Sequence, residues 1–163
     1  MELVKSRKDL INELEPATKK LLVHKKMEIF EDALLTIPGC TYGNSIHAPL
    51  EHQFGDGIYL RTIFMSKGTL LTTRIHKFRH PYFIMKGDVS ILTDEGEVRI
   101  KAPYSGMTER GTKRLIYVHE DTIWSTVHPT SETDTDLIEE QLTDWKFENY
   151  KNDKVIKVEI QEV

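Results

Sequence analysis

The sequence predicts a mainly β fold, a single antiparallel barrel or sandwich with helical segments at its two ends. From about residue 55 onward, apolar and polar residues alternate with a period of two, which is typical of half-buried strands. Turn-forming clusters separate these short segments without intervening helices. The chain has 163 residues, a length typical of one domain with its own core. The predicted strands are 57–65, 69–76, 82–87, 89–93, 97–103, 113–120 and 122–129.

Residues 1–37 are predicted to be helical, because the first 35 residues lack glycine and place apolar residues at helical spacing. Leu3, Leu10 and neighbouring apolar residues suggest one short helix. Pro16 suits the first turn of a second helix, where the missing N–H of proline costs nothing. The sequence PG at 38–39 is a stop signal, so the barrel segment is expected to span 38–130.

Residues 131–163 are predicted to add an acidic helix and a terminal strand to the same structural domain. Thr133, Asp134 or Asp136 could cap the helix, because their side chains accept hydrogen bonds from the free N–H groups of a first turn. Apolar and charged residues alternate over 154–163, which predicts a half-buried strand. This strand either adds to a sheet edge or exchanges with a partner, so we expect a homo-oligomer.

The composition is that of an ordinary globular protein, 39% hydrophobic and 29% charged. No apolar stretch approaches the ~20 residues that a membrane span requires. The first ten residues lack the apolar region of a signal peptide. The lone cysteine, Cys40, fits a reducing compartment. We therefore expect a cytoplasmic protein without membrane contact.

Charge is distributed unevenly along the chain, although the net charge is only −4. Residues 36–119 carry eleven basic and seven acidic side chains, whereas residues 120–163 carry four basic and twelve acidic ones. A general nucleic-acid-binding protein would present a basic face, so we expect no such binding. The acidic tail is either a solvated face or docks on the basic part of a neighbouring subunit.

The stretch TRIHKFRHPYFIMKGDVSIL, residues 73–92, resembles the first sequence motif of the cupins, small β-barrels of the jelly-roll type. Gly87 fits the closing glycine of that motif. This register places His80 where cupins have a glutamate, and His76 and Arg74 where they have two histidines. The resemblance implies a cupin-like antiparallel jelly-roll barrel.

The segment ERGTKR, residues 109–114, resembles the central part of the second cupin motif. Gly111 is in register, and Arg114 stands in the place of a histidine. Residues 49–142 also resemble uncharacterised cupin-type proteins encoded by bacteriophages. That likeness implies a phage source, with a location in the host cytoplasm or in the virion.

A metal centre is a weak expectation. A working cupin centre uses three histidines and one glutamate, and here two of those positions hold arginine, which is always charged and does not bind metals. On an extended strand, His76 and His80 would lie about 13 Å apart, so they share an ion only if residues 77–79 turn the chain. The His76–His80 pair is either structural, or lines a pocket, or binds a divalent transition metal. We therefore expect either no cofactor or a divalent transition metal.

Strand alternation predicts a basic pocket. If His76 points into the barrel, Arg74, two residues earlier, does so too, and Arg114 holds a comparable position on a later strand. A buried arginine is costly unless it is paired, and an external phosphate or carboxylate could be the partner. The alternative is that Arg74 and Arg114 pair with Glu120 or Asp121, or reach solvent at the barrel mouth. The residues expected to bind the ligand are Arg74, His76, His80, Arg114, Tyr59, Arg61, Trp124 and His128.

Three functions are therefore open from the sequence. The first is a small-molecule-binding protein whose barrel takes an anionic ligand, with binding that strengthens below the ~6.5 reference pKa of histidine. The second is a phage structural or assembly protein that uses the barrel as a scaffold and contacts other virion proteins. The third is a metal-dependent enzyme of the isomerase or dioxygenase type. The depleted metal motif argues against an enzyme.

Overall fold

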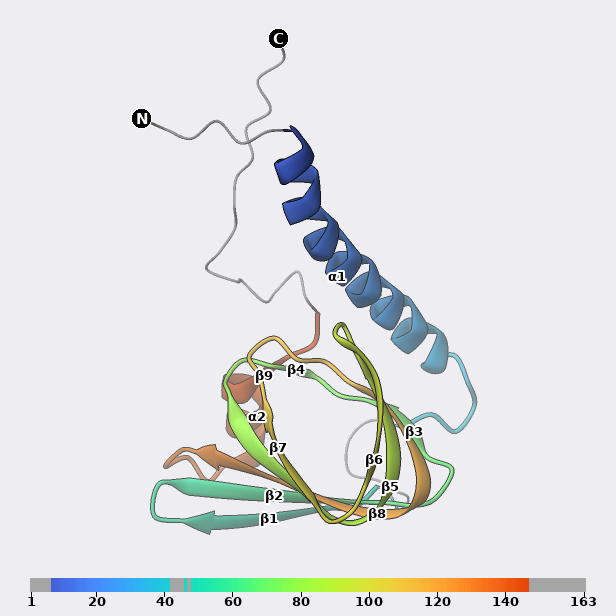
Figure 1. Ribbon diagram of the computed structural model, residues 1–163. Coiled ribbons are helices and arrows are strands. Elements are labelled where there is room, and N and C mark those ends of the chain that lie inside the picture. The colour runs from blue at the N-terminus through green and yellow to red at the C-terminus, as the bar shows by residue number, and fades with distance from the viewer. Residues whose placement is uncertain (1–6, 42–45, 47, 147–163) are drawn as a thin grey trace.

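The computed structural model describes residues 7–41, 46 and 48–146, which form a curled seven-stranded β-sheet, a two-stranded sheet and two helices (Figure 1). All strand pairs in this part of the chain are antiparallel, so the mainly β antiparallel prediction is confirmed. The helices are α1 (Arg7–Leu34) and α2 (Thr135–Leu142). The strands are β1 (Leu50–Gly55), β2 (Ile58–Met65), β3 (Leu70–Thr72), β4 (Ile75–His76), β5 (His80–Thr93), β6 (Gly96–Lys101), β7 (Tyr104–Thr108), β8 (Leu115–Pro129) and β9 (Thr143–Asp144).

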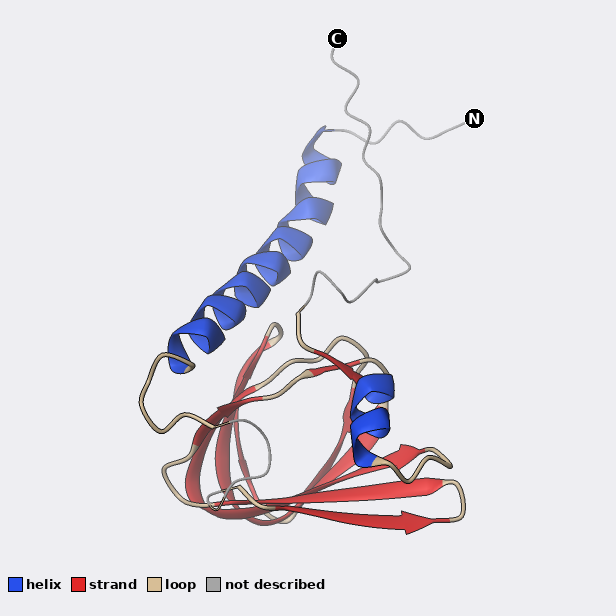
Figure 2. Ribbon diagram, turned by 180° about the vertical axis from the view of Figure 1, so that it is seen from behind, coloured by secondary structure: helices blue, strands red, loops and turns tan. Residues whose placement is uncertain are grey.

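The two long strands, β5 and β8, organise the barrel. They pair with each other, and further strands attach along their edges, in the order β1-β2-β8-β5-β6 with β3 on β8 and β7 on β5. Figure 2 shows the sheet curling around a central space. The core cluster comprises Met65, Tyr82, Ile84, Val89, Ile91, Ile100, Ile116, Val118 and Trp124. Met65, Ile116 and Trp124 also line the cavity described below.

The predicted strands 82–87 and 89–93 are a single strand, because Gly87 forms a bulge instead of a turn. Its φ of +108° lies where other residues are strained. A Cβ atom at this position would lie 2.7 Å from the Cα of Thr122 on β8. Glycine is therefore required here both by backbone conformation and by the close approach of the neighbouring strand.

Other strand differences have local causes. The predicted strands 113–120 and 122–129 join as β8, and Asp121 in the middle accepts a hydrogen bond from the backbone N–H of Lys67 at 2.9 Å. The sequence did not predict β1, because this edge strand consists mainly of exposed residues that hide the apolar alternation. It did not predict β7 either, because Gly106 interrupts the pattern where the Tyr82 ring packs against the strand backbone.

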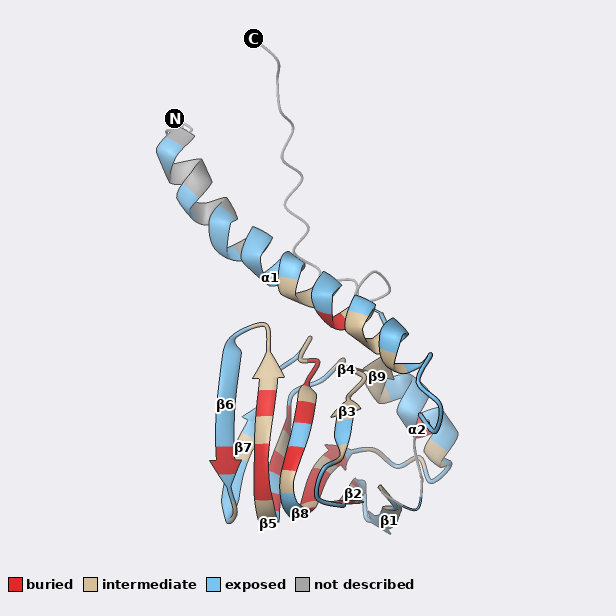
Figure 3. Ribbon diagram, turned by 90° about the vertical axis from the view of Figure 1, so that its right-hand side faces the viewer, coloured by how far each residue is buried: buried red, intermediate tan, exposed pale blue. Residues whose placement is uncertain are grey.

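The N-terminal segment forms one helix, α1, instead of the predicted pair. Pro16 lies inside it on an exposed position. A proline removes one helical hydrogen bond, but no glycine weakens the turns on either side, and the helix continues through it. The C-terminal part of α1 lies against the barrel, where Met27 is buried, while the N-terminal part extends beyond it (Figure 3).

The described part of the acidic segment, residues 131–146, packs on the barrel of its own chain. Asp134, one of the predicted caps, accepts hydrogen bonds at the start of α2, and Ile138 is only 2% exposed. Strand β9 then pairs with β4. The predicted strand 154–163, and the homo-oligomer inferred from it, fall outside the described residues and stay a prediction. In the described ranges, neither helix is long and apolar enough to span a membrane.

Candidate functional site

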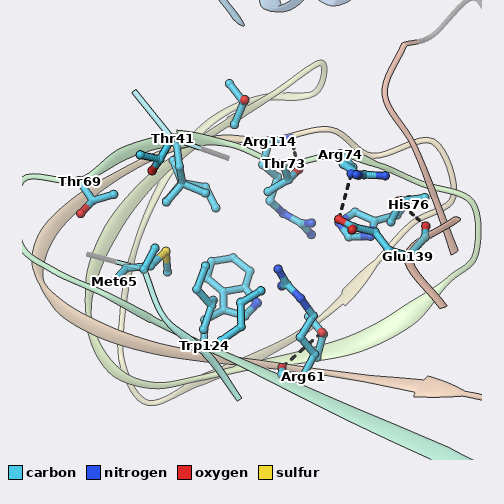
Figure 4. Close-up of a pocket in the computed structure, with 18 of the residues that line it drawn as sticks. Thr41, Arg61, Met65, Thr69, Thr73, Arg74, His76, Arg114, Trp124 and Glu139 are labelled. Atoms are coloured by element: carbon cyan, nitrogen blue, oxygen red, sulfur yellow. Dashed lines mark hydrogen bonds and ion pairs between the residues drawn. The ribbon is translucent and has the colours of Figure 1, made fainter. Parts of the chain in front are cut away.

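A cavity of about 840 Å³ occupies the interior of the barrel (Figure 4). Strands β2, β3, β4 and β8 supply much of its wall, and residues of α1 and α2 contribute to its rim. Seven of the eight predicted ligand-binding residues line it: Tyr59, Arg61, Arg74, His76, Arg114, Trp124 and His128. The eighth, His80, lies behind this wall, with its ring centroid 4.7 Å from that of His76 and 4.2 Å from that of His128.

Arg114 enters the cavity from the residue directly before β8. It is 6% exposed, and its Nη2 donates a hydrogen bond to the hydroxyl of Thr108 at 2.9 Å. Its guanidinium carbon lies 5.1 Å from the ring centroid of Tyr82 and 5.6 Å from that of Trp124, within the range of cation–π attraction. Among the described residues it has no carboxylate partner, so the alternative pairing with Glu120 or Asp121 is wrong.

Arg61 enters the same cavity from β2, on the opposite wall (Figure 4). Its guanidinium group has no hydrogen bond or ion pair with any described residue. Burial lowers the pKa of Arg61 and the pKa of Arg114, because the charged form loses hydration. Both groups nevertheless stay ionised, since arginine is effectively always charged in proteins. The cavity thus holds two guanidinium groups without a bonded carboxylate among the described residues, although the Glu139 carboxylate is near enough to Arg61 to offset part of the lowering of its pKa.

Arg74 differs from these two arginines. Its Nε lies 3.0 Å from Oε1 of Glu139 on α2, and its guanidinium carbon lies 3.8 Å from the ring centroid of Trp145. The prediction that Arg74 offers an unpaired charge to a ligand is therefore wrong. Arg74 does line the cavity, but not as a continuation of β3, which ends at Thr72.

Sequence reasoning did not identify Glu139 or Trp145 as residues of the site. The excess of acidic residues after the barrel did indicate a contact with the basic centre. We expected that contact, if any, with a neighbouring subunit, whereas Glu139 reaches Arg74 of the same chain. No spacing pattern in the sequence links a residue on α2 to a residue 65 positions earlier.

Three imidazole rings pack together beside the arginines. Nδ1 of His80 donates to the carbonyl oxygen of Phe78 at 3.0 Å, which leaves Nε2 of His80 unprotonated. This Nε2 and Nδ1 of His76 are buried without a hydrogen-bond partner among the described residues. His128 contacts the Thr126 hydroxyl through Nε2 at 3.1 Å.

The three histidines are neutral near pH 7. Burial is the largest cause that lowers the pKa of His76, His80 and His128, and nearby positive groups, Arg114 or Arg61, lower it further. For His128 the pKa falls to about 3. The lowered pKa values argue against protonated imidazoles just below pH 6.5 in the unliganded protein, and the expected gain in anion binding at that pH stays a prediction. The imidazoles contribute polarity and shape, and the arginines contribute the charge.

The next polar pair along the wall is Tyr59 and His52. Burial raises the pKa of Tyr59, so its hydroxyl stays protonated, and this hydroxyl shares a hydrogen bond with Nδ1 of His52 at 2.6 Å. His52 lies on β1, which the sequence did not predict as a strand.

A transition metal does not fit the described side chains well. No group of three or more His, Cys, Asp or Glu in the described ranges is arranged to hold a metal ion. The two unpartnered nitrogens of His76 and His80 are the natural donors, but Arg114 stands nearby and would repel a cation. Metal binding at His76 and His80 stays a prediction.

The histidine cluster predicts a pH dependence of stability. In the unfolded chain these imidazoles take up protons near pH 6.5, whereas in the folded protein their lowered pKa values keep them neutral to lower pH. Stability is therefore fully present above pH 6.5 and falls as the pH decreases. Each histidine contributes a slope of up to about 1.4 kcal/mol per pH unit.

Chemical denaturation between pH 6.5 and 5 measures this slope, and the carboxylates stay largely ionised there. The variant His128→Gln should show a slope shallower by about 1 kcal/mol per pH unit than the unmodified protein. Equal slopes in the two proteins would show that His128 does not resist protonation in the folded state.

Comparison with known proteins identifies the fold. No protein-family model and no curated protein matches the sequence. Ectoine synthase from P. lautus matches the structure with a TM-score of 0.50 and 15% identity, over 63% of this chain and 78% of that chain. A cupin domain from Bordetella pertussis Tohama I has a TM-score of 0.43 and 14% identity, over 57% of this chain and all of the other (100%).

A cupin superfamily protein from Desulfitobacterium hafniense DCB-2 has a TM-score of 0.45 and 10% identity, over 56% of this chain and 84% of that chain. At such identities a likeness shows the fold alone, and of the three structures named here only the ectoine synthase match has a TM-score high enough to support it. Together with the antiparallel topology, it confirms the prediction of a cupin-like jelly-roll barrel.

Proposed function

We propose that the protein binds a small anionic molecule in its barrel cavity, with the phosphate or carboxylate group held between Arg61 and Arg114. One observation carries this proposal: the guanidinium groups of the buried Arg114 and the partly buried Arg61 point into the same cavity from opposite walls, and neither is hydrogen-bonded or ion-paired with a carboxylate among the described residues. An anion between them would neutralise both.

The physical argument rests on the cost of burying charge. A buried cation without a partner is strongly unfavourable, and a planar guanidinium group binds phosphate or carboxylate through two parallel hydrogen bonds. Arg74 lines the same cavity, but its charge is paired within the chain, because Glu139 lies 3.0 Å from its Nε. Arg61 and Arg114 lack such a residue, so a ligand is the natural partner.

Thermal unfolding with added anions tests the proposal. Inorganic phosphate, at constant ionic strength set with chloride, should raise the melting temperature in a saturable way. At about 100 times the dissociation constant, the stabilisation is about 2.7 kcal/mol, or roughly 5–10 °C for a chain of this size. Acetate and citrate, tested in parallel, would show whether carboxylates act in the same way.

The variants Arg61→Gln and Arg114→Gln should each remove most of this rise without lowering the melting temperature of the unliganded protein by a similar amount. Arg79→Gln is the matched control, because Arg79 is exposed and bound to Glu109 outside the cavity. A rise that persists in both cavity variants would contradict the proposal, as would the absence of a rise with every anion.

The other two functions stay hypotheses. A scaffold role in a phage particle rests on the sequence resemblance. A metal-dependent isomerase or dioxygenase would need ligands beyond His76 and His80, and the positions expected for two of them hold Arg74 and Arg114.

A further inference from the structure

The cavity has two chemically different ends. Figure 4 shows Arg74, His76 and Glu139 at one end, Met65 at the other, and Arg61 between them. The lining includes a set of large apolar side chains: Leu34, Leu35, Leu50, Ile63, Met65, Leu71, Ile116 and Trp124. These come from α1, β1, β2, β3, β8 and the residue after α1, so the apolar surface faces the cavity from several sides.

Polar side chains also line this end, among them Ser66 and Lys67, and some of the others are already bonded. The hydroxyl of Thr72 donates to Oε1 of Glu31 at 2.6 Å, and Oε2 of Glu31 binds Lys113 at 2.6 Å. Thr41 and Thr69 lie at the edge of the cavity (Figure 4).

The volume also exceeds what an inorganic anion requires. A cavity of about 840 Å³ is far larger than phosphate, and it lies in the range typical of sites for organic ligands. With a bare anion bound at the arginines, the apolar walls would face water that has few hydrogen-bond partners there, and burial of an apolar group would release that water.

From this arrangement we infer that the ligand is an amphipathic anion, an acid with a carboxylate or phosphate head and an apolar body. The head lies between Arg61 and Arg114, and the body lies along Trp124, Met65 and Leu71 toward the C-terminal end of α1. This inference rests on the proposed function, since it places the head group at the same two arginines.

A chain-length series tests the inference. The probes are acetate, butanoate, hexanoate and octanoate, with inorganic phosphate in parallel, measured by titration calorimetry and, for the weakest, by melting-temperature titration. Affinity should rise about three- to fourfold for each added methylene group until the apolar end is filled. The heat-capacity change of binding should become more negative along the series.

Two cavity variants and one control locate the apolar body. Leu71→Gln and Leu34→Gln should each weaken hexanoate binding about tenfold while changing acetate or phosphate binding less than twofold. Two variants are used because Leu71 also packs against the core, whereas Leu34 lies on α1. Met85→Gln is the control, because Met85 is 55% exposed and is not part of the cavity lining.

The possible outcomes separate the two proposals. Affinity that does not change with chain length, but still depends on Arg114, overturns the amphipathic ligand and keeps the anion site. If affinity rises with chain length but is the same in Arg114→Gln and in the leucine variants as in the unmodified protein, the fatty acid binds outside the cavity. That result overturns the inference. If no anion shows binding that depends on Arg114, the proposed function itself fails.

Discussion

Gly87→Ala is expected to destabilise the protein by about 3 kcal/mol or more, because strain and steric overlap act together at this position. The φ of +108° is unfavourable for alanine, and the added Cβ would meet the Cα of Thr122 at 2.7 Å. Backbone atoms of a central strand cannot move aside, so β5 and β8 would have to separate at the bulge. The other strands of the seven-stranded sheet attach to these two strands or to their neighbours, so the loss of stability should affect the whole fold.

Gly96→Ala is the matched control for this effect. Gly96 has a φ of +125°, but nothing lies within 4 Å of the point that an alanine Cβ would occupy, so only backbone strain of about 1–2 kcal/mol is expected. Urea denaturation followed by circular dichroism gives both free energies of unfolding. An equal loss of unfolding free energy in the two variants would show that Thr122 moves to accommodate the added Cβ, so that the close contact at Gly87 adds no cost.

Glu31→Gln is the second large effect, with an expected loss of about 3–5 kcal/mol, because it leaves a buried ammonium group without its carboxylate. Nζ of Lys113 lies 2.6 Å from Oε2 of Glu31, and the Lys113 side chain is only 1% exposed. This ion pair joins α1 to the residue before Arg114. Its loss should therefore loosen the helix end that contributes to the rim of the cavity.

Lys113→Met should be much less harmful than Glu31→Gln, because it removes the buried charge instead of isolating it, and Glu31 is partly exposed. Glu109→Gln is the control for ion pairs in general. It breaks the exposed pair with Arg79, and we expect a change of less than about 1 kcal/mol. If Glu31→Gln and Lys113→Met cost the same, the desolvated lysine is not the source of the effect.

The fold could be predicted from the sequence because strand alternation is a local signal. Segments such as 57–65 show a period of two that one strand produces by itself, and the structure has β2 over Ile58–Met65. Gly87 was recognised as a break but was assigned to a turn. The sequence does not reveal that one strand continues through Gly87 as a bulge beside Thr122. The single helix through Pro16 was missed because propensity alone places a helix start there.

The candidate site was predicted in part for the same reason. Alternation suggested an inward position for Arg114 and allowed one for Arg61 and His128, and all three line the cavity. It could not predict which arginine the chain neutralises. That depends on α2 bringing Glu139 to Arg74, a contact set by tertiary packing between segments far apart in the sequence.

The arginines of the cavity also disfavour a metal ion beside them. The guanidinium group of Arg114 is unfavourable for a nearby cation and favourable for an anion, whereas that of Arg74 is already paired with Glu139. The neutral histidines beside them are consistent with this preference, since a protonated imidazole would add to an uncompensated positive charge.

The central claim, an anion held between Arg61 and Arg114, is tested most directly by locating an anion in crystals of the protein. Selenate is a tetrahedral oxyanion whose selenium scatters anomalously, so a soaked crystal reports its position without assumption. We expect the strongest anomalous peak inside the barrel, within hydrogen-bond reach of both guanidinium groups, and no such peak in Arg114→Gln crystals. Selenate found only on the outer surface, with none in the cavity, would contradict the claim.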